Sequence, residues 1–147
     1  MKQHDNPQHN NSQHGDSGGS PREFPADSMP QVDFEIDFYG KILARHPLYL
    51  EVLRRQAELL AARHRHAEAL LCDQRLSAAL PQDAEVRYNL SCSLAILGRV
   101  AEAVGSLSLA FELGYRDFEH VESDPDLEVV RNDPHFVALL KLYRVDV

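Results

Sequence analysis

Histidine and cysteine are the residue types in this chain that could do chemistry, and their spacing decides which chemistry is available. His64 and His66 flank a single arginine, a spacing that can begin a transition-metal site. No cysteine or carboxylate triad stands beside them to complete a coordination set. His120 and His135 are isolated, and no spacing ties a serine or cysteine nucleophile to either of them. The sequence therefore predicts no metal site, no cofactor and no enzyme activity.

The cysteines, the glycines and the overall charge exclude further classes of function. Cys72 and Cys92 are not in a C-x-x-C spacing, so we expect reduced, buried thiols. Gly18 and Gly19 lie in a polar stretch with no strand before them, which argues against a phosphate-binding loop. The net charge of −8 argues against non-specific binding to nucleic acid. With no long apolar run and no apolar leader, we expect no membrane association and a cytoplasmic location.

Residues 1–31 form a polar segment rich in His, Gln and Asn, with few large apolar residues. Such a segment cannot bury enough surface to offset its ordering entropy, so we predict a disordered tail. His4, His9 and His14 recur at five-residue spacing within it. They indicate either a weak metal-binding tail or a polar tail that is merely rich in histidine, and the second interpretation is favoured.

The chain matches itself at a spacing of 34 residues, and this repeat predicts the secondary-structure elements that would position any site. Repeats of this length, apolar at helical spacing and punctuated by Pro and Gly, are typical of helix–turn–helix solenoids. The pattern predicts an all-α superhelix, which offers a surface for another protein rather than a catalytic cleft. The matched pairs are Pro47 with Pro81, Leu60 with Leu94, Glu68 with Glu102, Ala69 with Ala103, and Leu70 with Val104.

The repeat divides residues 32–147 into four parts. Residues 32–46 alternate apolar and acidic side chains like a strand, but they also fit helical spacing and end before Pro47, so we predict a lone helix. Residues 48–81 and 82–115 are the two full helix pairs, with Asp83 as an N-cap. The last part is a terminator of two short helices at 116–143.

Local signals mark the ends of these helices and their close contacts. Gly98 and Gly114 are placed to end helices in a left-handed conformation. The pairs Asp124-Pro125 and Asp133-Pro134 each place a capping acid before a proline suited to the first helical position. We expect close helix–helix approach at five small residues: Ala57, Ala69, Ser91, Ala103 and Ala110.

Three stretches of the chain resemble the tetratricopeptide repeat family. They are AEALLCDQRLSAALP, YNLSCSLAILGRVAEAVGSLSLAFELG and the ending SDPDLEVVRNDPHFVALL. Within the second stretch, Tyr88, Asn89, Gly98, Ala103 and Ala110 occupy positions that the family pattern prefers. The first repeat departs from the pattern at three positions. Gln56 replaces an aliphatic residue, His64 a turn glycine and Asp73 an aromatic residue.

The resemblance implies that the first helices of successive repeats line a groove for a partner. In such a groove Asn89 offers a donor and an acceptor to an extended backbone, and Arg54 with Arg55 could hold a carboxylate. A carboxylate clamp of the chaperone-binding kind is incomplete here, because Asp117, Glu119 and Glu122 stand at its third position. The implied groove residues are Glu51, Arg54, Arg55, Glu58, Glu85, Tyr88, Asn89, Cys92 and Ala95.

These observations lead to the hypothesis of a non-catalytic adaptor that binds a protein or peptide segment in its groove. Two alternatives remain open at this point. The chain could be a small acidic chaperone for a secreted or membrane-inserting client, or a structural protein that self-associates through its repeat faces.

Overall fold

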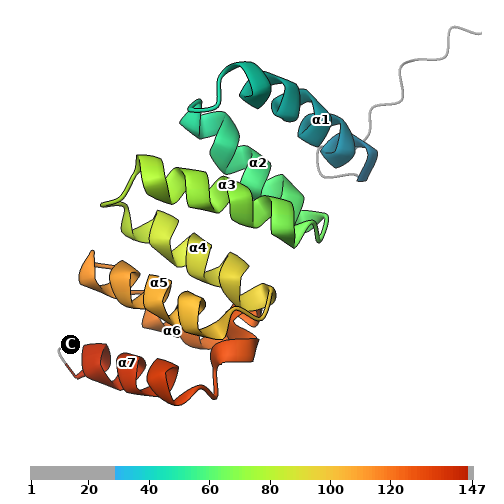
Figure 1. Ribbon diagram of the computed structural model, residues 1–147. Helices are drawn as coiled ribbons and strands as arrows, with labels where there is room; N and C mark the ends of the chain where they lie inside the picture. Colours follow the sequence, from blue (N-terminus) through green and yellow to red (C-terminus); the bar gives the residue numbers. More distant parts are fainter. Residues whose placement is uncertain (1–28, 146–147) are drawn as a thin grey trace, which may run out of the picture.

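The structure, a computed structural model, describes residues 29–145 of the chain and shows an all-α solenoid (Figure 1). The predicted disorder of the tail concerns residues that lie almost entirely outside this described range. The helices stack one behind the next along the solenoid. They are α1 (Met29–Arg45), α2 (Leu50–Ala62), α3 (His66–Ala79), α4 (Ala84–Ile96), α5 (Val100–Glu112), α6 (Phe118–Ser123), the 3-10 helix η1 (Pro125–Val130) and α7 (Pro134–Arg144).

The lone first helix forms as predicted, but it begins at Met29 rather than at residue 32. Pro30 stands in its first turn, where the missing N–H is not needed and the fixed φ suits a helix. One face buries Val32, Ile36 and Leu43 at helical spacing against the rest of the stack. Of the alternating apolar residues that suggested a strand, Val32 and Ile36 lie on this buried stripe, whereas Phe34 and Phe38 are exposed.

The turns that connect the two helices of each pair share one hydrogen-bond pattern. After α2, the His64 N–H donates to Ala61 O at 2.9 Å and the Arg65 N–H to Leu60 O at 2.8 Å. Thirty-four residues on, Gly98 and Arg99 repeat these bonds after α4. His64 takes the left-handed conformation with φ 58°, as the predicted glycines do at Gly98 (74°) and Gly114 (107°).

Aspartates cap the starts of α4, α6, η1 and α7. The side chain of Asp83 accepts from the Val86 N–H at 3.0 Å, which confirms the predicted N-cap of α4. Asp133 caps α7 in the predicted way. The terminator differs from the prediction because it holds three elements. α6 precedes the Asp124-Pro125 pair, and the segment that follows this pair is a 3-10 helix.

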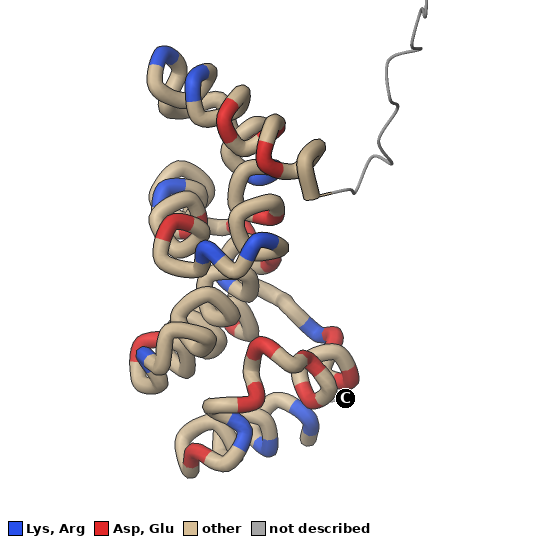
Figure 2. Tube along the Cα trace, turned by 90° about the vertical axis from the view of Figure 1, so that its right-hand side faces the viewer, with Lys and Arg blue, Asp and Glu red and all other residues tan. Residues whose placement is uncertain are grey.

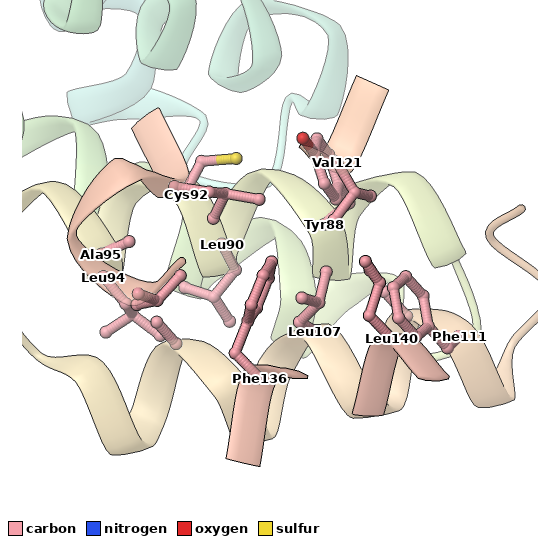
Figure 3. Close-up of a cluster of buried hydrophobic side chains, with 14 of the residues drawn as sticks. Tyr88, Leu90, Cys92, Leu94, Ala95, Leu107, Phe111, Val121, Phe136 and Leu140 are labelled. Carbon is pink, nitrogen blue, oxygen red and sulfur yellow. The ribbon is translucent and has the colours of Figure 1, made fainter. Parts of the chain in front are cut away.

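The core runs the length of the stack in two clusters of buried side chains. The N-terminal cluster surrounds Leu53, and the C-terminal cluster, shown in Figure 3, surrounds Phe111 and Leu107. All five small residues expected at helix–helix contacts are buried, which agrees with close helix approach. Within residues 29–145, none of the helices combines the length and the apolar character that crossing a membrane requires.

Candidate functional site

A polar groove of about 280 Å³ lies where α2, α3 and α4 meet. Five of the residues that the sequence assigned to a groove line it, from two successive first helices, α2 and α4. The structure adds four residues that the sequence did not indicate, from all three helices: Ala57, Asp73, Leu76 and Ser93. The lining residues are Arg54, Ala57, Glu58, Asp73, Leu76, Glu85, Asn89, Cys92 and Ser93.

Arg54 is held by a partner within the chain. Its guanidinium lies 3.1 Å from the carboxylate of Asp83, which also caps α4. The backbone N–H of Val86, together with Arg54, keeps the pKa of Asp83 below its usual range. Arg54 therefore braces the start of α4, and its positive charge is already balanced on the groove wall.

Asp73 forms part of the groove floor, a place that the sequence did not assign to it. Its side chain is almost fully buried, with 6% of the residue exposed, and accepts a hydrogen bond from the Ser93 hydroxyl. Burial raises the pKa of Asp73 to about 6, and the bond from Ser93 offsets only part of that effect. The signal in the sequence was an acid at a position where the family that the chain resembles prefers an aromatic residue.

Asn89 and Glu85 project from α4 into the groove, and both are exposed. Among the described residues, no side-chain hydrogen bond engages the Asn89 amide, so its donor and acceptor face the open groove. Glu58 reaches the groove from α2 and pairs weakly with Arg55 at 3.5 Å. Glu58, Glu85 and Asp73 therefore give the groove lining more carboxylates than unpaired basic side chains, since Arg54 is paired with Asp83.

Arg55 and Glu51, which the sequence assigned to the groove, lie outside it. Arg55 turns toward α1, where its guanidinium is 3.4 Å from the carboxylate of Glu35. Glu51 is exposed and does not line the groove. Ala95 is fully buried in the core. The predicted pair of arginines therefore does not converge on one carboxylate site.

Tyr88 is buried rather than presented to a partner. Its hydroxyl donates to Asp124 at 2.5 Å, and its ring stacks on Tyr115 with centroids 4.4 Å apart. The burial of the hydroxyl raises the pKa of Tyr88 well above its usual range. The terminator covers this side chain, so Tyr88 joins α4 to the end of the stack.

Cys92 stands at the boundary between the groove and the terminator. Its thiol lies 3.6 Å from the same Asp124 carboxylate, and burial raises its pKa well above the usual range. Burial likewise raises the pKa of Cys72 to about 11. Both cysteines are free and buried, as the sequence predicted. At neutral pH they are protonated thiols, which are poor nucleophiles.

The Asp124 carboxylate gathers several groups that the sequence did not bring together. Cys92, Asp124 and Asp126 have ligand atoms within 4.8 Å of one another. The oxygens of Asp124 already accept from the Tyr88 hydroxyl and from the Asp126 backbone N–H. These two bonds join α4 to the start of η1, so the Asp124 carboxylate has a structural role at this junction.

The paired histidines of the first turn lie side by side but stay isolated from other ligands. The rings of His64 and His66 are 5.7 Å apart and meet edge to face. Within residues 29–145, neither belongs to a group of three potential metal ligands. His64 owes its place to the turn, where it takes the position held by Gly98 in the next repeat.

A chloroplastic protein from Arabidopsis thaliana shares part of this sequence. The two chains are 38% identical over 68 residues. The match covers 46% of this chain and 20% of the Arabidopsis protein, so the matched part is about a fifth of that relative's length. No protein-family profile and no solved structure matches the chain. The similarity is confined to a part of each protein.

Proposed function

We propose that this chain is a non-catalytic cytoplasmic adaptor that binds an extended segment of another protein in the groove between α2, α3 and α4. The observation that carries the proposal is Asn89, an exposed amide that projects from α4 into the groove with no side-chain partner among the described residues. An amide can donate to one backbone carbonyl of an extended chain and accept from an N–H of the same chain.

The charges of the groove indicate which segments it suits. Glu58 and Glu85 line its walls, Asp73 lies on its floor, and Arg54 is balanced by Asp83. A lysine or arginine side chain that reached Asp73 would pair with a carboxylate held away from water, where charge pairing is stronger. The proposed partner segment therefore carries at least one basic residue, in contrast to the acidic partner that two free arginines would select.

We also propose that the repeats are of the tetratricopeptide type. The helix pairs α2–α3 and α4–α5 end their first helices with the same pair of turn hydrogen bonds, 34 residues apart. Small buried residues lie at the helix contacts that this repeat pattern prefers. A local hydrogen-bond register that recurs with the sequence period supports a true structural repeat.

A random peptide display library, selected on the full-length chain at pH 7.5, tests the groove directly. We expect the selected peptides to be enriched in lysine and arginine. Binding of a selected peptide should weaken roughly tenfold or more in Asn89→Ala, because both hydrogen bonds of the amide to the peptide backbone are lost. Glu85→Gln should weaken it by a smaller factor, since this carboxylate is exposed and screened.

Two variants outside the groove serve as matched controls. Glu112→Gln repeats the carboxylate change at the end of α5, and Gln74→Ala repeats the amide truncation on α3. Both positions are exposed and neither lines the groove, so peptide affinity should stay unchanged. Equal affinity of the wild type, Asn89→Ala and Glu85→Gln for the selected peptides would reject the groove as the binding site.

A further inference from the structure

The outer face of α1 is uncovered at the N-terminal end of the described stack (Figure 1). Among the described elements, α2 is the one with which α1 shares an extensive contact. Every other long helix before the terminator packs between two neighbours. An end helix of a solenoid therefore presents a face that an inner helix would bury.

That face carries aromatic side chains. Phe34 and Phe38 are 63% and 50% exposed, and their rings stack almost parallel with centroids 6.1 Å apart. Leu48 and Tyr49, in the turn after α1, are also more than half exposed. Exposed aromatic residues grouped in this way are typical of contact surfaces between proteins.

The charged residues of α1 are ordered so that one α1 helix is complementary to a second, antiparallel α1 helix. Asp33, Asp37, Lys41 and Arg45 follow one another at four-residue steps, two acids before two bases. Figure 2 shows the basic positions toward one end of α1 and the acidic positions toward the other. If two copies of α1 lie antiparallel with their midpoint at residue 39, each acid of one copy meets a base of the other.

Asp37 and Lys41, the inner two of these charges, are the more available for contacts between copies. The side chains of Asp37 and Lys41 are 71% and 77% exposed, and they pair with each other at 3.0 Å across one turn. Asp33 already pairs with Arg63, the residue that follows α2, at 2.7 Å, so Asp33 is less available for a second contact. The antiparallel arrangement would form the Asp37–Lys41 contact twice, once on each side of a two-fold axis.

We propose that a second copy of this chain docks on α1, antiparallel, with Phe38 of each copy near the middle of the contact and Phe34 of each copy beside Ala44 of the other. In this register the first turn of one α1 lies beside the turn that follows the other. A pocket of about 750 Å³, lined by Ile42, Pro47, Leu48 and Tyr49 among others, opens at that end and receives it. The surface is separate from the groove, so the proposal does not depend on the proposed function.

Sedimentation velocity of the full-length chain over a range of concentrations measures the association. We expect a monomer–dimer equilibrium in the micromolar range, because one helix pair buries less area than a standard stable interface. Phe34→Ser with Phe38→Ser should leave a monomer. Leu142→Ser is the matched control, since Leu142 is 65% exposed on α7 at the far end of the stack, and it should dimerise as the wild type does.

Charge reversal tests the antiparallel register. Asp37→Lys alone and Lys41→Asp alone should each weaken the dimer roughly tenfold, because both inter-chain pairs become repulsive. The double reversal should restore it. An equimolar mixture of the two single variants should form a heterodimer, since the basic pair of one chain then meets the acidic pair of the other.

Three results would overturn the proposal. The wild type could stay monomeric at every concentration, which would leave the α1 face to another occupant such as residues 1–28. Dimers could persist in the double serine variant, or both single charge reversals could dimerise as the wild type does. Circular dichroism of each variant confirms that the helices are intact, which is expected because all five substituted positions are exposed.

Discussion

At the scale of single residues, burial separates neighbours that look equivalent in the sequence. Tyr88 and Asn89 are adjacent on α4, yet Tyr88 is buried under the terminator and Asn89 lies open to the groove. Arg54 and Arg55 are likewise adjacent, but each pairs with a carboxylate on a different side of α2. Successive helical residues point about 100° apart, so the position along the chain says little about the partner.

Asp73→Asn should change how stability depends on pH. The pKa of Asp73 rises from 3.8 to about 6 in the folded chain, so the folded state holds a proton that the unfolded state has released. Asp73 therefore stabilises the fold below about pH 4, and this contribution is lost as pH rises toward about 6. Above that pH, Asp73→Asn should be more stable than the wild type by up to about 3 kcal/mol.

Urea denaturation of both proteins from pH 4 to pH 8 measures the difference. Exposed carboxylates contribute equally to the two proteins and cancel in the comparison. Asp126→Asn is the control, since its carboxyl is exposed and its pKa is raised less by burial. A difference between wild type and Asp73→Asn that stays constant over this range would mean that Asp73 titrates like a solvated carboxyl.

At the scale of the elements, the turns fix where each helix stops. Gly98 and Gly114 take the left-handed conformation at no steric expense, because a glycine has no Cβ. His64 takes it as well, although an L-residue with a side chain is strained there by about 1–2 kcal/mol. The hydrogen bonds of the turn form all the same, so tertiary packing of α2 on α3 overrides the local preference.

His64→Gly should therefore stabilise the chain, by about 1 kcal/mol or slightly less, since glycine also loses more entropy on folding. The matched change is Gly98→Ala at the equivalent position, which should destabilise by about 1 kcal/mol. No neighbouring atom lies within 4 Å of an added Cβ at Gly98, so backbone strain alone would be measured. Urea midpoints that moved in the opposite directions would contradict this account of the turn.

At the scale of the whole molecule, the core forms two clusters that meet between α3 and α4. Leu53 is fully buried in the N-terminal cluster and Phe111 in the C-terminal one. Each helix packs mainly on its neighbours in the stack, so the two halves have few direct contacts beyond that junction. Stability in such a fold is close to a sum of local terms.

Leu53→Ala and Phe111→Ala should each destabilise the half in which they lie. The expected losses are about 2–5 kcal/mol for Leu53→Ala and about 3–5 kcal/mol for Phe111→Ala, through lost burial and the cavity left behind. Native-state hydrogen exchange should show faster opening of α1–α3 in the first variant and of α5–α7 in the second. Equal acceleration throughout in both variants would mean that the stack opens as a single unit.

The sequence by itself determined the all-α solenoid, the helix pairs and most of their ends. These features depend on short-range chemistry: the apolar period within a helix, aspartates at helix starts and glycines at the turns. The resemblance to the tetratricopeptide repeat family implied nine groove residues, and five of them line the groove.

Only the tertiary structure decided what each side chain meets. Tyr88 and Asp124 are 36 residues apart and Arg54 and Asp83 are 29 apart, and no period within one repeat predicts either pair. The start of α1 and the 3-10 helix of the terminator were missed for a related reason, since both depend on how the ends of the stack pack. Asp73 becomes buried on the floor of the groove, and Phe34 stays exposed, only once the helices are stacked. Burial is a property of contacts between elements, which the sequence alone does not give.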